Sequence, residues 1–142
     1  MPAGPCPFCG FDEPDVTVFR GTHVQAFISL QPINRHHVLV VPDGHVTRFA
    51  QLEPAVRDEV FAVAQRIQRA IAEVVRPDGI TMVSDDDLTG PHLNLVAHWK
   101  LHLIPRFRND AVRIDWSRTP DPGTALRAGY AATVRNAIQA GA

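Results

Sequence analysis

The hydrophobic pattern of the chain is clearest at residues 98–104, where polar and apolar side chains alternate. Basic side chains occupy every second position there, and large apolar side chains lie between them. A period of two is the pattern of a half-buried β-strand, whose side chains point alternately to opposite faces. We therefore expect one strand face that carries His98, Lys100 and His102.

Other segments predict further strands, because they are rich in β-branched residues and end at turn-forming residues. The alternating segment itself begins at residue 92. The remaining predicted strands cover residues 16–19, 24–30, 37–41 and 80–84.

Apolar residues spaced three and four apart predict two helices. The first begins at Pro54, where the missing N–H of proline is harmless, and ends before residues 77–79. The second follows residues 120–123. Strands and helices together indicate an α+β chain, which at 142 residues fits a single domain.

Composition narrows the classes of partner. The formal net charge is −1 with neutral histidines, which gives no sign of nucleic-acid or bilayer binding. No apolar run approaches the length of a membrane span, and the first residues lack the basic start and apolar stretch of a secretory signal. We therefore expect a cytoplasmic protein.

The two cysteines, Cys6 and Cys9, are spaced Cys-x-x-Cys. In a reducing compartment a structural disulfide is not expected, and the spacing suits a metal site or a redox pair. Two histidines would complete a tetrahedral zinc site around such a pair. The chain has seven histidines, and spacing alone does not choose among them. Two unrelated small residues in a terminal segment remain a third interpretation.

Several motifs, taken in order, resemble the histidine-triad (HIT) family. They are the cysteine pair, the Ala-Phe segment that ends at Pro32, the segment from His36 to His45, the amphipathic helix, and the run from His98 to Arg106. The resemblance covers most of residues 6–110. It implies a HIT-like α+β fold with an antiparallel sheet of five to six strands, a long helix, and a C-terminal helix at about residues 123–140.

The same resemblance implies which histidines join the cysteines. Zinc-bearing members of the family hold the metal with two cysteines, the histidine of a Pro-x-x-His segment and the first histidine of the triad. Those positions are Cys6, Cys9, His45 and His98 in this chain. A closed set of four protein ligands leaves no open coordination position, so the zinc is expected to be structural.

The resemblance also implies a reaction, and this chain differs from the family at the residue that carries that reaction out. In HIT enzymes the middle histidine of the triad attacks the α-phosphorus of a nucleotide derivative, displaces the leaving group and forms a nucleotidyl-histidine that water resolves. Lys100 occupies that position here. An unperturbed lysine has a pKa near 10.4, so only about one in a few thousand is a free amine at pH 7. A protonated His102 on the same strand face would help to lower that pKa. The favoured role of Lys100 is anion binding, and a nucleophile and a structural group are the alternatives.

Other positions of the implied pocket differ from the family too. Ser29 stands where an acidic residue usually holds the ribose, Asn94 where a glutamine is usual, and Ser84 approximately where an asparagine is expected. His37 and His102 match family positions at the phosphate end of the site. We assign catalytic roles to Lys100, His102 and His37 if the protein is active, and ligand binding to the other three.

Three functions follow from these residues. The first is binding of a nucleotide-like or other anionic ligand in an atypical site that resembles nucleotidyl hydrolases and transferases. The second is a non-catalytic, zinc-containing binding or regulatory protein, and the third is an enzyme whose divergent chemistry uses Lys100. By resemblance the chain is expected to form a homodimer.

Overall fold

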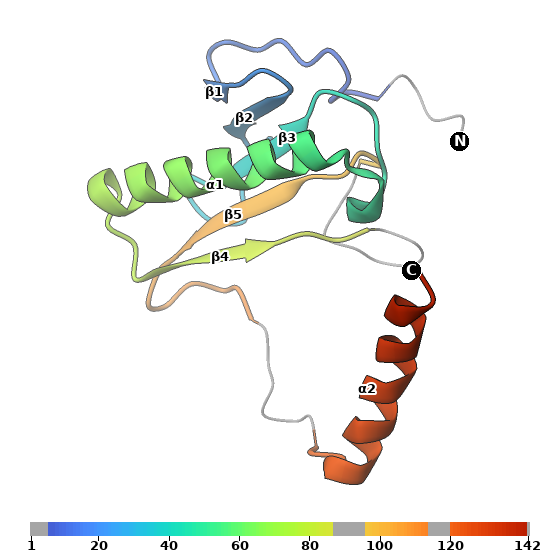
Figure 1. Ribbon diagram of the computed structural model, residues 1–142. Coiled ribbons are helices and arrows are strands. Elements are labelled where there is room, and N and C mark those ends of the chain that lie inside the picture. Colours follow the sequence, from blue (N-terminus) through green and yellow to red (C-terminus); the bar gives the residue numbers. More distant parts are fainter. Residues whose placement is uncertain (1–5, 87–95, 114–119, 142) are drawn as a thin grey trace, which may run out of the picture. The chain divides into compact units, whose positions relative to one another are not determined.

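The computed structural model describes residues 6–86, 96–113 and 120–141. The chain divides into two compact units, Met1–Val112 and Arg113–Ala142, which are described separately. Because this division leaves the expected single domain untested, that expectation stays a prediction. The strands and the long helix belong to the first unit, which also carries the candidate site (Figure 1).

The first unit is built on one antiparallel sheet of five strands in the order β1-β2-β3-β5-β4. Neighbours along the chain form a meander from β1 to β3, whereas β4 and β5 pair with each other after the helix. The strands are β1 (Thr17–Arg20), β2 (Val24–Ile28), β3 (Val38–Pro42), β4 (Gly79–Val83) and β5 (Leu101–Arg106).

One face of the sheet is covered by the long helix α1 (Pro54–Val74), which follows the short 3-10 helix η1 (Phe49–Gln51) (Figure 1). Proline at the first position begins α1, as expected. Its buried stripe packs against alternate residues of β2, β3 and β5, and this cluster includes Val60, Ile67 and Leu103. Burial of this stripe is what holds α1 on the sheet.

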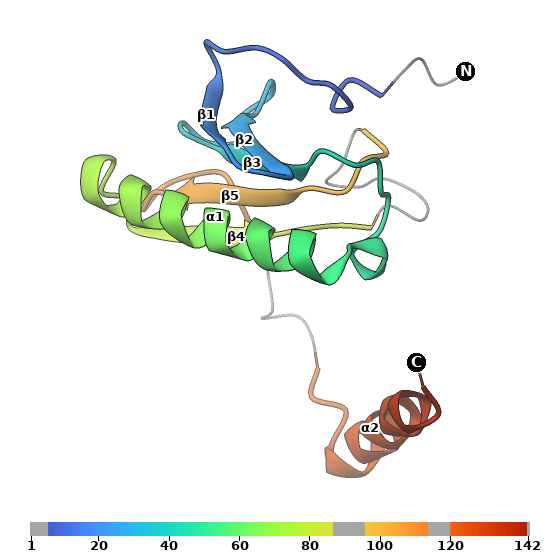
Figure 2. The same cartoon turned by 45° about the horizontal axis from the view of Figure 1, so that its top comes forward.

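The opposite face of the sheet is covered by the N-terminal segment (Figure 2). Phe8 packs against Phe27 of β2, with ring centroids 5.4 Å apart, and Leu39 and Val41 of β3 complete this smaller core. Side chains alternate between the two faces along a strand, so every second residue of β3, counted from Leu39, lies on the same face as Leu39. The functional side chains considered below lie on this side.

The expectation of a half-buried strand at residues 98–104 is wrong in two respects. Strand β5 begins only at Leu101, and residues 96–98 form a bend in which the His98 N–H donates to the Val96 carbonyl at 2.8 Å. Both faces are buried, because α1 lies on one and the N-terminal segment on the other. The alternation of polar and apolar residues therefore shows on which face of the sheet each side chain lies. It does not show that the polar face is exposed to water.

The expected fold is confirmed: a five-stranded antiparallel sheet with a long helix and a C-terminal helix. The C-terminal helix α2 (Thr124–Gln139) forms the second unit. No helix among the described residues is long and apolar enough to cross a membrane. The cytoplasmic location expected from the sequence stays a prediction.

Candidate functional site

Two thiols and two imidazoles converge where the N-terminal segment meets the sheet. One ligand atom from each of Cys6, Cys9, His45 and His98 can be chosen so that all four lie within 4.8 Å of one another. The cysteines come from the turn around Phe8, His45 from the segment after β3, and His98 from the bend before β5. Three segments far apart in the sequence therefore meet at one point.

The distances within this cluster fit a tetrahedral zinc ion. The Nδ1 atom of His98 lies 3.3 Å from the Cys6 sulfur and 3.6 Å from the Cys9 sulfur, and His45 Nδ1 lies 3.3 Å from the Cys9 sulfur. Zinc–sulfur and zinc–nitrogen bonds of about 2.3 and 2.0 Å in a tetrahedron place sulfur and nitrogen about 3.6 Å apart. The donor set and its spacing therefore suit a four-coordinate metal.

The backbone fixes the tautomer of His98 in the form that a metal needs. Its Nε2 atom lies 2.8 Å from the carbonyl oxygen of Pro42, and a carbonyl oxygen only accepts, so Nε2 carries the proton. Burial lowers the pKa of His98 and keeps the ring neutral at pH 7. The lone pair of Nδ1 therefore points at the two sulfurs, and the carbonyl holds the ring from behind.

A second cluster lies on the same side of the sheet, where His37 and His102 are in contact. The Nε2 atom of His37 lies 2.9 Å from Nδ1 of His102, and both residues are buried. His37 directly precedes β3, and His102 lies in β5 opposite Leu39. Pairing of β3 with β5 thus brings together two histidines that are 65 residues apart.

Burial keeps both histidines of this pair neutral. It lowers the pKa of His37 to about 4. For His102 burial is again the largest cause, helped by the charges of His37 and Lys100, and the pKa falls to about 3. The condition under which His102 would lower the pKa of Lys100, a protonated ring, is therefore not met at neutral pH.

A chain of donors fixes where the protons of the pair lie. The backbone N–H of Ile33 donates to Nδ1 of His37 at 3.1 Å. A neutral imidazole has one N–H, so the proton of His37 is on Nε2 and is donated to Nδ1 of His102. The proton of His102 is then on Nε2, which makes His102 a hydrogen-bond donor toward a ligand.

Lys100 lies on the same side of the sheet and is 2% exposed. Its Nζ donates to the Val96 carbonyl at 3.0 Å and lies 5.2 Å from the centre of the Phe8 ring. A carbonyl and an aromatic face both stabilise the charged ammonium. Its charge also lowers the pKa of both His98 and His102. Lys100 therefore stands between the thiol cluster and the histidine pair.

The three residues expected to contact a ligand lie in different places relative to the histidine pair. The backbone N–H of Ser29 donates to the His37 carbonyl at 2.9 Å, which places Ser29 beside the histidine pair. Ser84 is exposed and follows β4, whose last residue Val83 pairs with His102. Asn94 lies outside the described residues. Ligand binding by these three residues stays a prediction.

Sequence reasoning missed the Arg106–Asp110 pair, which supports the loop after β5. Two guanidinium nitrogens of Arg106 donate to the carboxylate at 2.7 and 3.0 Å, and Asn34 donates to it at 2.9 Å. The Arg106 guanidinium is the main cause that holds the pKa of Asp110 well below its usual range. Opposite charges four residues apart are a recognisable signal, but their link to Asn34 is a tertiary contact.

The low pKa values of His37 and His102 predict a loss of stability in acid. The unfolded chain takes up protons below its ordinary histidine pKa of 6.5, whereas the folded pair resists until about pH 4 and 3. The stabilisation is complete above pH 6.5 and falls as the pH drops toward 4, by at most about 1.4 kcal/mol per pH unit for each histidine. Urea unfolding between pH 7 and 4 measures this slope.

The matched control for this prediction is an exposed histidine, His23, whose hydrogen bonds to other described residues are made by its backbone. A double variant with His37→Gln and His102→Gln should flatten the dependence of the unfolding free energy on pH. His23→Gln should leave the dependence unchanged. An equal slope in the double variant and the wild type would contradict the assigned cause.

Comparison with known proteins matches residues 11–109 to the HIT domain. The chain is 27% identical to "Protein hit" of Bacillus subtilis over 121 residues, which cover 82% of this chain and 81% of that protein. It is 34% identical to the AP-4-A phosphorylase of Mycobacterium tuberculosis over 100 residues, or 70% of this chain. The aligned part is 51% of the phosphorylase, so the chain spans about half the length of that relative.

Solved structures agree with this assignment. A HIT family protein from Bacillus anthracis superimposes with a TM-score of 0.80 at 28% identity, covering 95% of this chain and 98% of the other. A zinc-bound histidine triad family protein from Mycobacterium smegmatis gives 0.65 at 27% identity, covering 95% and 97%. With the sheet, the long helix and the matched segment in agreement, the chain belongs to the HIT domain family.

Proposed function

We propose that this protein binds a nucleotide-like phosphate ligand beside His37, Lys100 and His102. The observation that carries the proposal is the fixed hydrogen-bond chain from the Ile33 N–H through His37 to His102. It makes the outer nitrogen of His102 a donor, two residues from the ammonium of Lys100. Donors and a positive charge suit phosphate oxygens. An AP-4-A phosphorylase among the relatives supports a nucleotide as the ligand class.

We also propose that Lys100 stands where catalytic relatives carry the attacking histidine. An ammonium held by the Val96 carbonyl and the Phe8 ring has no lone pair to attack phosphorus. The His102 lone pair at Nδ1 is taken by the His37 proton. On this proposal the site recognises the ligand without forming a nucleotidyl-histidine, and Ser29, Ser84 and Asn94 line the rest of the pocket.

Zinc is the proposed metal of the thiol cluster, with a structural role. Two thiolates and two imidazoles are a donor set that zinc prefers, and four protein ligands leave no open position. The two imidazoles that face the sulfurs favour a metal over a redox pair. The metal would fasten the N-terminal segment over the face that holds Lys100.

A homodimer is the proposed assembly. Strand β4 is an edge strand, and Met82 on it is 47% exposed near Phe61 of α1, which is 39% exposed. An edge strand with adjacent exposed apolar residues is a surface that another chain can cover. A light-scattering mass of a single chain at micromolar concentration would contradict this assembly.

Binding of AMP tests the proposed function. Isothermal titration at pH 7.5 should give saturable binding, and His102→Ala should weaken it by at least tenfold because the donor is lost. His23→Ala is the control, since this exposed histidine lies in the β1–β2 turn and its hydrogen bonds to other described residues are made by its backbone. Absence of binding by the wild type, or equal affinity of His102→Ala, would refute the proposal.

A further inference from the structure

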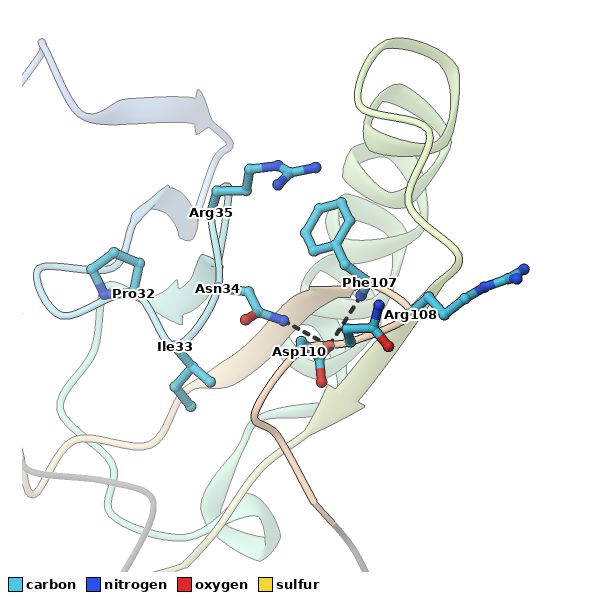
Figure 3. A pocket seen from close by; sticks show the side chains of 8 residues that line it. Pro32, Ile33, Asn34, Arg35, Phe107, Arg108 and Asp110 are labelled. Atoms are coloured by element: carbon cyan, nitrogen blue, oxygen red, sulfur yellow. Dashed lines mark hydrogen bonds between the residues drawn. The ribbon is translucent and has the colours of Figure 1, made fainter.

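A second polar cleft lies in the first unit, between the loop at residues 32–35 and the loop at residues 107–110 (Figure 3). Its volume is about 600 Å³, and none of its lining residues belongs to the thiol cluster or the histidine pair. Ser29 and Ser84, which the sequence predicted to bind a ligand, do not line it either. The cleft is therefore separate from the site described above.

The floor of the cleft is held by the Asp110 carboxylate. Asn34 from the first loop donates to it at 2.9 Å and also to the Pro105 carbonyl at 2.9 Å, so one amide ties the two loops together (Figure 3). The backbone N–H groups of Phe107 and Val112 donate to the same carboxylate. With Arg106 also paired to it, the negative charge of Asp110 is largely compensated.

Two guanidinium groups at the rim of the cleft carry a positive charge that no carboxylate of the described residues balances. Arg35 lies over the ring of Phe107, with its central carbon 3.7 Å from the ring centre. Arg108 projects from the other loop, and its backbone N–H donates to Asp78 at 2.8 Å. Neither Arg35 nor Arg108 forms an ion pair with a residue in the part of the chain that the structure describes.

We propose that this cleft binds a diphosphate group through Arg35 and Arg108. A guanidinium fork matches two phosphate oxygens, and stacking on Phe107 limits the freedom of Arg35 before any ligand arrives. Two arginines on opposite loops and a cleft larger than one phosphate group suit an anion with two linked phosphates. The proposal goes beyond the function proposed above, because neither arginine belongs to that site; Ile33 lines the cleft and contributes to the other site only its backbone N–H.

Inorganic pyrophosphate is the probe, titrated into the full chain by calorimetry at 0.15 M salt. The wild type should bind saturably, and the double variant Arg35→Gln with Arg108→Gln should bind at least tenfold more weakly. Arg35→Lys should give an intermediate affinity, since lysine keeps the charge but not the fork. Circular dichroism and melting temperature confirm that each variant folds.

Two control variants test whether pyrophosphate binds in this cleft. Arg66→Gln removes another exposed arginine that lies over a phenylalanine, Phe19, at 4.9 Å, and should bind like the wild type. His102→Ala removes a donor of the site proposed for AMP and therefore tests whether pyrophosphate binds beside the histidine pair instead of in the cleft. If Arg66→Gln lowers the affinity for pyrophosphate as much as the double variant does, the attraction is unspecific. If only His102→Ala lowers the affinity, the anion binds at the histidine pair. If the wild type shows no saturable binding, the site does not exist. Each of these three results overturns the proposal.

Discussion

His45→Ala is expected to release the bound metal and to lower the melting temperature by about 10 °C. The reason is that a metal held by the proposed four ligands would join the N-terminal segment, the segment after β3 and the bend before β5. Loss of one ligand leaves two thiols and one imidazole, and the turn that holds Phe8 over the sheet loses its attachment. Structural zinc contributes several kcal/mol or more to folding, and about 3 kcal/mol corresponds to about 10 °C for a unit of this size.

Metal content by mass spectrometry and thermal unfolding by circular dichroism measure the two effects. The matched control is His23→Ala, which replaces another exposed histidine whose hydrogen bonds to other described residues are made by its backbone. The control should retain one zinc per chain and the wild-type melting temperature. A wild-type protein purified without chelator that holds far less than one metal per chain would refute the site.

Lys100→His is expected to switch on release of AMP from diadenosine tetraphosphate or an AMP morpholidate by at least a hundredfold. A histidine with an ordinary pKa is mostly a neutral nucleophile at pH 7, whereas a lysine offers about one free amine in a few thousand. Removal of the Lys100 charge also removes one of the causes that lower the pKa of His102. A protein mass increase of one adenylyl group would report the covalent intermediate.

Lys100→Gln is the control, because it removes the charge without supplying a nucleophile. It should show no hydrolysis and no adduct. If Lys100→His binds AMP but remains inactive, the identity of this side chain is not what separates the protein from catalytic relatives. Rapid hydrolysis of diadenosine tetraphosphate by the wild type would contradict the proposal that the site binds its ligand without catalysis.

Local patterns indicated the α+β class, and the family resemblance supplied the fold and the residues of the site. The period of three to four residues located α1 to within a few residues. The period of two identified β5 but began it at residue 92 instead of Leu101, because alternation also runs through residues 96–100, which are not in the strand. The ordered motifs pointed to the HIT family, which the comparisons confirm. The four residues of the thiol cluster were predicted together, and the structure brings them together.

Protonation and burial could not be predicted in the same way. Alternation at residues 98–104 suggested a half-exposed strand with a polar face, but the segment that covers this face comes from the N-terminal part of the chain. That covering lowers the pKa of His102, so this histidine is neutral and adds no positive charge beside Lys100. The burial of a side chain depends on which distant segment packs over it, which no local spacing encodes.

Residue type and spacing by themselves determined the secondary-structure elements and the cysteine pair. The family resemblance added the two ligating histidines and showed that the lysine at residue 100 is unusual. Only the tertiary structure decided that the Pro42 carbonyl sets the tautomer of His98 and that the Ile33 N–H sets that of His37. It also decided that Asn34 and Asp110 join two loops into one cleft. The contacts of His98 with Pro42 and of Asn34 with Asp110 join segments that the pairing of β3 with β5 brings together, whereas the contact of Ile33 with His37 lies within one loop.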